Sequence, residues 1–232
     1  MQLGGTPAQL VDQVRDGVVD VIWTLPGYTP GRFPRIEAFE LPFMMQSPEG
    51  TSKALWDYMQ QQAPNEFKDV QPLAFHVHGD GVFHMANKPI KTLADFKGLK
   101  LRAPTRQTNK FLAALGATPV AMPVPAVGEA ISKGVIDGAV VPYEVVPSVK
   151  IQELVKFHSE TDPAEPAFYT STFVFAMNKA KYQALPPDLK KVIDANSGVA
   201  LSGQIGKTFL AADAEGKKLT TRNTTNVIPA SE

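Results

Sequence analysis

The sequence predicts an α/β fold, because helical and strand signals alternate along most of the chain. The most informative segment is 98–105, where a short strand ends on an arginine and a helix begins almost at once. A hydrophobic fraction of 44% and a charged fraction of 20% are typical of a soluble globular protein. The 232 residues suffice for one large domain or two small ones.

The segment 98–105 combines three local signals. Alternation places Leu99 and Leu101 on one face of the strand and Arg102 on the other. Pro104 ends the strand, and Thr105 can cap a helix that runs to Gly116. In open parallel α/β sheets, ligands bind beyond the carboxyl ends of the strands, and a helix N-terminus there favours anions. These features would suit an anion bound by Arg102, but the segment alone favours a surface arginine or half of an ion pair.

The other elements follow from caps, turns and apolar spacing. In chain order we expect a helix from Thr6-Pro7 to Gly17, a strand at 18–23, a helix from Ser47-Pro48 through Leu55, Trp56 and Met59, strands at 72–77 and 82–86, a capping box at 92–95, a strand at 118–122, a helix at 124–133, a strand at 135–141 and an extended run at 169–177. Gly79-Asp80-Gly81 reads as a hairpin turn between two of these strands.

The C-terminal third predicts one long helix. No proline occurs from 188 to 222, and apolar residues keep a broadly helical spacing. Roughly 35 residues at 1.5 Å each would span about 50 Å, more than the width of one small domain. Such a helix would tie two lobes together, although Gly198, Gly203 and Gly206 allow a kink or break.

Composition excludes several classes of protein. The 23 basic and 23 acidic residues balance, with no long run of one sign, so non-specific binding to nucleic acid is not expected. The chain has no apolar run long enough to insert in a membrane. The absence of cysteine removes disulfides, thiol catalysis and cysteine metal sites.

Histidines supply the main chemical candidates. His76 and His78 would lie on one face of a strand, where they could share a metal ion with Asp80. His84 follows closely, but no carboxylate pattern completes a set of ligands, which favours hydrogen-bonded structural histidines. We find no phosphate loop, dinucleotide fingerprint, serine elbow or zinc-protease motif. The sequence therefore favours binding over catalysis.

Several segments together resemble the solute-binding proteins of the tripartite ATP-independent periplasmic (TRAP) transporters, of the dicarboxylate-receptor type. The matching segments are Gln2-Leu3-Gly4-Gly5, Gly17-Val18-Val19-Asp20, Phe39-Glu40-Leu41-Pro42-Phe43, 91–104, 115–123, 129–131, 134–138 and 185–189. The resemblance covers residues 2 to about 215, with 91–104 as its most specific part.

The resemblance implies a two-lobed periplasmic-binding-protein-like fold with discontinuous lobes and a long helix that spans both. It places residues 1–79 and 172–211 in lobe I, and residues 80–171 and 212–232 in lobe II. Both termini look truncated, since lobe I would lack an N-terminal strand-helix-strand and lobe II a C-terminal helix. The implied protein is a periplasmic receptor, not an enzyme, whose signal peptide is missing from this sequence. It would close around a small organic acid and deliver it to the membrane permease subunits.

The resemblance also implies which residues bind the ligand. Arg102 matches the arginine that clamps the ligand carboxylate, and Thr24 and Thr105 would bond a 2-oxo or 2-hydroxy oxygen. Val82 and Val141 stand where sialic-acid-binding members carry an arginine and an asparagine, which argues against a polyhydroxylated ligand. Aromatic side chains near the cleft would suit a flat or aliphatic body behind one carboxylate: Trp23, Tyr143, Phe168 and Phe173. We therefore expect a monocarboxylate, such as a 2-oxo, 2-hydroxy or aromatic acid.

Two other functions stay open. An enzyme acting on a small carboxylic acid could be built on the same scaffold, with Glu144 and His84 as its acid–base pair. Alternatively, a cation could bridge the ligand and Glu144, although no cofactor is expected. Lobe cores also contain aromatic residues, so each aromatic candidate could be structural instead.

Overall fold

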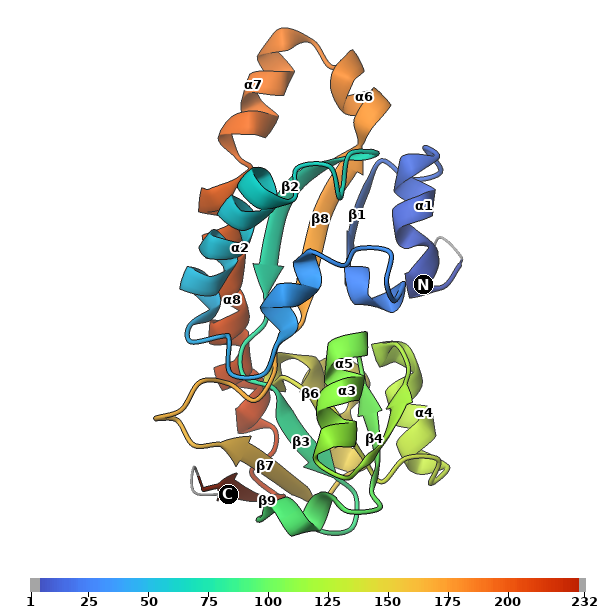
Figure 1. Cartoon of the computed structure of the whole chain (residues 1–232), viewed down its shortest axis with the longest axis vertical. Coiled ribbons are helices and arrows are strands. Elements are labelled where there is room, and N and C mark those ends of the chain that lie inside the picture. Colours follow the sequence, from blue (N-terminus) through green and yellow to red (C-terminus); the bar gives the residue numbers. More distant parts are fainter. Residues whose placement is uncertain (1–4, 230–232) are drawn as a thin grey trace. The chain divides into compact units, whose positions relative to one another are not determined.

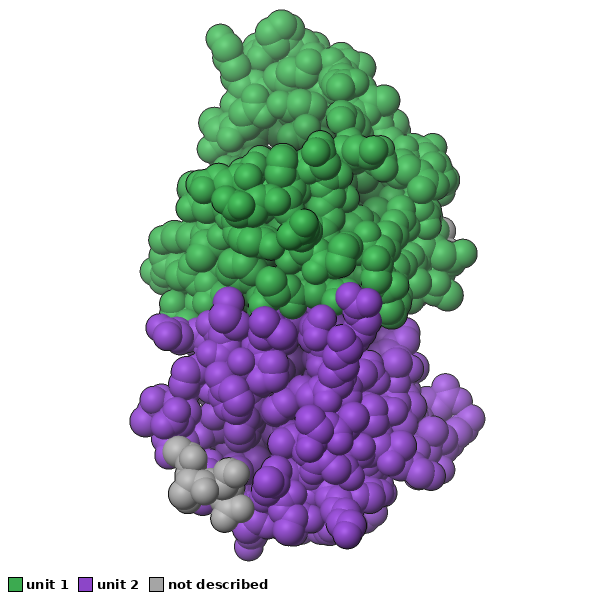
Figure 2. All heavy atoms as spheres, viewed as in Figure 1, with its two compact units in different colours: residues 1–39, 47–77, 171–207 green, residues 40–46, 78–170, 208–232 purple. Residues whose placement is uncertain are grey.

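The computed structural model describes residues 5–229 and divides into two compact units, shown in Figure 2. Unit 1 comprises residues 1–39, 47–77 and 171–207, and unit 2 comprises residues 40–46, 78–170 and 208–232. The expected match at Gln2-Leu3-Gly4 lies outside the described residues.

Residues 40–46 belong to unit 2, whereas the sequence placed them in lobe I. The main chain explains this difference: the Phe43 N–H donates to the Ala167 carbonyl at 3.0 Å, and the Ala167 N–H donates to Met45 at 3.1 Å. The other divisions fall at 77/78, 170/171 and 207/208, against the expected 79/80, 171/172 and 211/212.

Unit 1 is built on a three-stranded antiparallel sheet. Strands β1 (Val21–Thr24), β8 (Thr172–Asn178) and β2 (Val70–Val77) lie in the order β1-β8-β2. The helices of unit 1 are α1 (Leu10–Arg15), α2 (Pro48–Gln62), α6 (Lys179–Ala184), α7 (Pro187–Ala195) and the first part of α8 (Val199–Lys218), with 3-10 turns at Pro7–Gln9, Pro26–Tyr28 and Ile36–Glu40.

Helices α2 and α8 lie along strand β2 (Figure 1). Ser47 caps α2 as the sequence predicts, since its hydroxyl accepts from the Gly50 N–H at 3.2 Å. Ser52 on α2 accepts from the Val77 N–H at 3.0 Å, and Ser202 on α8 accepts from the Phe75 N–H at 3.1 Å. These serine hydroxyls satisfy main-chain donors of β2, an edge strand within the sheet.

Unit 2 is built on a mixed six-stranded sheet in the order β5-β4-β6-β3-β7-β9. Its strands are β3 (Val82–Met85), β4 (Lys100–Ala103), β5 (Thr118–Ala121), β6 (Gly138–Val141), β7 (Phe157–Thr161) and β9 (Thr224–Ile228). Strands β5, β4 and β6 are parallel, β3 is antiparallel to both of its neighbours, and β7 and β9 are parallel. The expected α/β class is therefore confirmed, with a mixed sheet.

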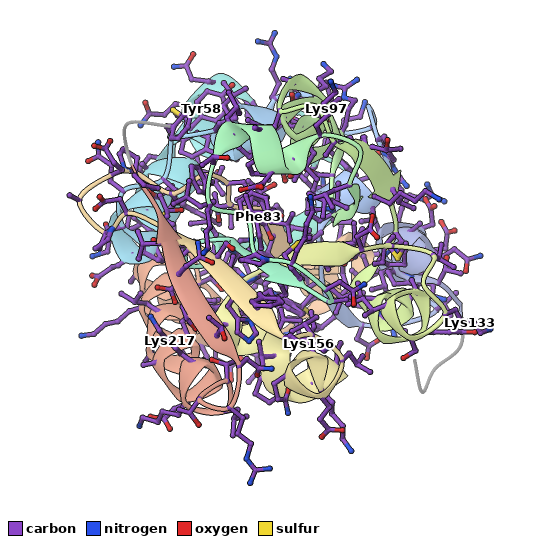
Figure 3. All side chains as sticks on the ribbon, turned by 90° about the horizontal axis from the view of Figure 1, so that it is seen from below. Tyr58, Phe83, Lys97, Lys133, Lys156 and Lys217 are labelled. Carbon is purple, nitrogen blue, oxygen red and sulfur yellow. The ribbon has the colours of Figure 1, made fainter. Side chains whose placement is uncertain are left out.

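The helices of unit 2 cover a sheet with two apolar faces. They are α3 (Arg106–Ala114), α4 (Val127–Ser132), α5 (Val146–Val149) and the rest of α8, with 3-10 turns at Leu93–Phe96, Val124–Ala126, Tyr143–Val145 and Ile151–Glu153. Phe83 belongs to one hydrophobic cluster and Val82 to the other, because successive strand residues point to opposite faces. Phe83 lies inside unit 2, whereas the Lys97 and Lys133 side chains extend outward (Figure 3).

The expected hairpin at Gly79-Asp80-Gly81 is wrong. Strands β2 and β3 belong to different sheets, and the segment between them enters unit 2 beside the chain around Tyr169. The Gly81 N–H donates to the Tyr169 carbonyl at 3.2 Å, and Thr170 Oγ1 donates to the His78 carbonyl at 3.0 Å. A Cβ on Gly81 would lie under 3.0 Å from the Tyr169 ring, so this close approach requires glycine.

The single C-terminal helix is also wrong, because the chain breaks between α7 and α8. Gly198 has a φ of +84°, and its N–H donates to the Leu73 carbonyl at 2.7 Å. Helix α8 then continues for 20 residues through Gly203 and Gly206, beginning in unit 1 and ending in unit 2. A helix therefore does connect the units, but it is shorter than expected.

Candidate functional site

Arg102 is buried and held in place by the main chain of unit 2. Its side chain is 1% exposed. Nε donates to the Met122 carbonyl at 3.0 Å, and Nη1 donates to the Val140 carbonyl at 2.9 Å. Met122 follows β5 and Val140 lies in β6, the two parallel neighbours of β4. The guanidinium is thus a fixed positive charge at the carboxyl end of three parallel strands.

The chain after Arg102 forms the strand-to-helix turn that the sequence predicts. Strand β4 ends at Ala103, and α3 begins at Arg106 after the N-cap Thr105 (Figure 1). Thr105 Oγ1 accepts from the Thr108 N–H at 3.4 Å. The first turn of α3 therefore adds partial positive charge beside the strand end that carries Arg102. The arrangement suits an anion.

His78 lies in the electrostatic field of Arg102. The ring is 2% exposed, and its Nδ1–H donates to the Gly79 carbonyl at 2.6 Å. Burial, with a smaller contribution from the positive charge of Arg102, lowers the pKa of His78 to about 4. The side chain is therefore a neutral imidazole near neutral pH. The sequence suggested only a structural or metal-binding role for His78, and its proximity to Arg102 could not be read from it.

The two threonine candidates differ in how their hydroxyls are used. Thr105 Oγ1 caps α3, so its oxygen already has a structural role. Thr24 lies at the end of β1 in unit 1 and is 3% exposed. Its Oγ1 is buried and forms no hydrogen bond within residues 5–229. A buried hydroxyl of this kind is costly, which makes Thr24 the stronger candidate for a ligand contact.

Two of the aromatic candidates stack in unit 1. The Trp23 and Phe173 rings lie 4.9 Å apart, centroid to centroid, with an interplanar angle of 4°. His76, which the sequence did not nominate for ligand binding, stacks on Phe173 at 4.6 Å and 5°. We call these three residues the ring platform. Phe173 is 4% exposed, whereas Trp23 is 46% exposed and offers indole surface to a ligand.

The two valine candidates form an apolar pair in unit 2. Val82 on β3 and Val141 on β6 are directly opposite in register, 3% and 1% exposed. They pack in the hydrophobic cluster that contains Val127, Ile136 and Val146. Val141 also follows Val140, whose carbonyl holds Arg102.

Phe168 belongs to a separate group of aromatic rings in unit 2. It packs against Phe43, Phe83 and Phe111 at centroid distances of 6.0, 5.7 and 6.4 Å. These rings and their apolar neighbours line a cavity of about 100 Å³. The contacts support a packing role for Phe168, the alternative that the sequence left open.

Tyr143 and Glu144 follow β6 and make polar contacts. The Tyr143 hydroxyl donates to Glu160 Oε1 at 2.6 Å, and burial together with that carboxylate raises the pKa of Tyr143. The Glu144 N–H donates to Asp213 Oδ1 at 2.8 Å. Burial raises the pKa of Glu144 to about 7, with repulsion from Asp213 as the second cause, and burial also raises the pKa of Asp213 to about 7.

The structure corrects the expectation that His76 and His78 lie on one strand face. Strand β2 ends at Val77, so His76 belongs to unit 1 and His78 to unit 2, not to one strand face. His84 on β3 instead contacts His158 on the neighbouring strand β7, with 2.7 Å between the two Nδ1 atoms. The Nε2 atom of His84 lies 3.2 Å from the Val141 carbonyl. Among residues 5–229, no three His, Asp or Glu side chains gather in a way that could hold a metal ion.

The sequence also left open that His84 and Glu144 form the acid–base pair of an enzyme, and the contacts of His84 bear on this alternative. Burial, with a smaller contribution from the neighbouring His158, lowers the pKa of His84 to about 3. Both ring nitrogens contact other groups of unit 2. His84 is therefore a neutral, hydrogen-bonded residue of the sheet.

The family model for "Bacterial extracellular solute-binding protein, family 7" matches residues 2–229. A curated relative, the 2,3-diketo-L-gulonate-binding periplasmic protein YiaO of Escherichia coli, is 27% identical over 214 residues, which cover 91% of this chain and 63% of the relative. The chain thus spans about three fifths of that relative's length. Within residues 5–229, no helix is both long and apolar enough to cross a membrane.

Solved structures with bound aromatic acids are more similar. A TRAP solute-binding protein from Rhodoferax ferrireducens, in complex with copurified benzoate, is 64% identical with a TM-score of 0.98; the match covers 100% of this chain and 72% of that one. A marine metagenome TRAP protein specific for aromatic acid ligands, co-crystallized with 3-hydroxybenzoate, is 51% identical with a TM-score of 0.96, covering 99% and 72% of the two chains.

Proposed function

Because the chain belongs to family 7 of the bacterial extracellular solute-binding proteins, we propose that it is a receptor that captures a small aromatic monocarboxylate. It works in the periplasm and delivers its ligand to the permease subunits of a TRAP transporter. It does not convert the ligand chemically.

The observation that carries this proposal is the buried, fixed guanidinium of Arg102. Backbone carbonyls hold two of its donors, and five N–H groups in a planar fork match the geometry of a carboxylate. The capped N-terminus of α3 adds positive potential at the same strand end. In a water-poor setting such an ion pair is much stronger than it would be on the surface.

The aromatic ligand class rests on two further features. The pair Val82 and Val141 offers no polar group to a sugar hydroxyl, so a polyhydroxylated acid would lose hydrogen bonds there, at about 1–3 kcal/mol each. The ring platform in unit 1 offers indole surface on which a benzoate-like ring can stack. Proteins that are 64% and 51% identical to this chain hold benzoate and 3-hydroxybenzoate.

In this proposal, binding of the ligand favours the closed state of a hinge. The chain passes from one unit to the other at 39/40, 46/47, 77/78, 170/171 and 207/208. Ligand contacts that exist only in the closed state would shift the population toward it. Thr24 contributes a hydroxyl to the ligand's carboxylate or to a neighbouring hydroxyl group.

A thermal-shift panel tests the ligand class. We expect benzoate, 3-hydroxybenzoate and mandelate to raise the melting temperature more than acetate or galacturonate does. Stabilisation by galacturonate alone would contradict the aromatic class. After overnight incubation, mass spectrometry of the released benzoate should find it unchanged. A chemically modified product would show that the protein is an enzyme and would contradict the receptor function.

A further inference from the structure

The ring platform contains a hydrogen bond that the proposed function does not require. Trp23 Nε1–H donates to His76 Nε2 at 2.7 Å, and the two rings are nearly coplanar, at 7°. Both rings stack on Phe173, at 4.9 Å and 4.6 Å. Indole and imidazole therefore form one flat surface over a single phenyl ring, joined edge to edge.

This bond defines the tautomer of His76. Because Trp23 Nε1 is a donor only, His76 Nε2 accepts and carries no proton. The proton is then on Nδ1, which lies 3.2 Å from the Val77 carbonyl as its acceptor. The imidazole is neutral, 0% exposed and bonded at both nitrogens.

The exposed Trp23 side chain has more freedom to move than the buried Phe173 and His76, so the hydrogen bond matters most for its orientation. It lies on β1, an edge strand within the unit 1 sheet, and 46% of it is exposed. A large exposed side chain loses rotamer freedom when a ligand orders it, and this loss weakens binding. Phe173 stacks on the indole but does not prevent the indole from sliding or turning within the indole plane. The hydrogen bond to the indole N–H restricts both of these movements.

We infer that His76 is a positioning residue that holds the Trp23 indole flat on Phe173, and so makes the receptor selective for planar, aromatic acids. This inference rests on the proposed function for its ligand, but the geometry of His76 and Trp23 is a property of the chain itself. His76 acts through Trp23 and needs no contact with the ligand. An aliphatic acid gains little from a flat, preoriented ring, whereas an aromatic acid gains stacking energy.

Two substitutions separate the roles of His76. His76→Phe keeps a ring to stack on Phe173 but removes the acceptor for Trp23. His76→Gln supplies an amide oxygen as acceptor but removes the ring. We expect His76→Phe to weaken benzoate binding roughly three- to tenfold, the effect of one lost hydrogen bond, with less than a twofold change for butyrate. His76→Gln should recover part of the preference for benzoate.

A double-mutant cycle shows whether the effect passes through Trp23. In a Trp23→Phe background, His76→Phe should leave the ratio of benzoate to butyrate affinities unchanged. Isothermal titration calorimetry on the four proteins measures these ratios, and melting curves confirm that each is folded. An equal ratio in wild type and His76→Phe, or the same loss in both backgrounds, would overturn the inference.

Fluorescence tests the positioning without any ligand. Trp56→Phe removes the other of the two tryptophans, so the emission then comes from Trp23 alone. We expect His76→Phe to shift this emission and lower its anisotropy, and His76→Gln to reverse part of both changes. Unchanged emission and anisotropy would overturn the inference. A wild-type protein that binds no acid in calorimetry would reject the proposed function, while fluorescence would still decide the role of His76.

Discussion

Arg102 Nη1 donates to the Val140 carbonyl at 2.9 Å, a bond that ties a buried charge to the neighbouring parallel strand. The second bond, from Nε to Met122, ties the same guanidinium to the segment that follows the strand on its other side. An arginine fixed in this way is oriented before any ligand arrives, so binding need not order it. The remainder of the proposed site depends on this preorganisation.

Replacing Thr24 with valine should stabilise the protein without ligand and weaken ligand binding. The buried Thr24 hydroxyl forms no hydrogen bond among the described residues, and the substitution removes it. We therefore expect the free energy of unfolding without ligand to rise by about 1 kcal/mol. If the hydroxyl contacts the ligand, benzoate affinity should fall roughly tenfold. Urea unfolding and calorimetry measure the two effects.

Thr170→Val is the matched control for Thr24→Val. The Thr170 hydroxyl is equally buried but donates to the His78 carbonyl at 3.0 Å. Its removal should therefore lower the free energy of unfolding by about 1–3 kcal/mol. A loss of stability in Thr24→Val as large as in Thr170→Val would show that the Thr24 hydroxyl is bonded after all.

Glu144 should make the stability of the protein depend on pH. Burial, with repulsion from Asp213 as the second cause, raises the pKa of Glu144 in the folded state from its ordinary 4.5 to about 7, so the folded state binds the proton more tightly. Its contribution to stability is therefore present below about pH 4.5 and is lost as the pH rises through 7. Glu144→Gln should stabilise the protein more at pH 8 than at pH 5, by about 2 kcal/mol.

Urea unfolding at both pH values measures this difference. Exposed Glu165, replaced by glutamine, controls for the loss of one negative charge as such. A Glu144→Gln effect of the same size at pH 5 and pH 8 would mean that the carboxyl is not destabilised by burial and by Asp213.

Gly206 should tolerate no side chain, although it lies in the middle of a helix. A Cβ there would lie under 3.0 Å from the Pro48 carbonyl of α2, which is backbone and cannot move aside. Gly206→Ala should therefore destabilise the protein by about 1–3 kcal/mol through overpacking. In α4, a Cβ on Gly128 would meet its nearest atoms at 3.6 Å. Gly128→Ala should instead stabilise by up to about 1 kcal/mol. Thermal melts that rank the two variants in the opposite order would refute this account of the α2–α8 contact.

The sequence was sufficient to predict those elements whose hydrogen-bond partners lie only a few residues away. Thr105 and Ser47 act as N-caps, and Thr92 and Asp95 form a capping box, because each cap bonds groups only a few residues away. The position of Arg102 at a strand end before a helix could be predicted for the same reason.

The sequence could not specify features that depend on distant partners. Gly79 to Gly81 looks like a hairpin turn, but its course is set by the chain near Tyr169. The break at Gly198 coincides with a bond to Leu73, and His84 pairs with His158, 74 residues away. Likewise, Trp23 and His76 are 53 positions apart in the sequence, so no local pattern predicts the hydrogen bond between them. Such contacts follow from tertiary packing and leave no local pattern.

Isothermal titration of benzoate into wild type, Arg102→Lys and Arg102→Ala tests the central claim most directly. Removing one partner of a buried ion pair costs about 3–5 kcal/mol, so we expect Arg102→Ala to lose roughly two to three orders of magnitude in affinity. Arg102→Lys should recover only part, because an ammonium group lacks the planar fork. Near-equal affinity of wild type and Arg102→Ala would contradict the carboxylate clamp.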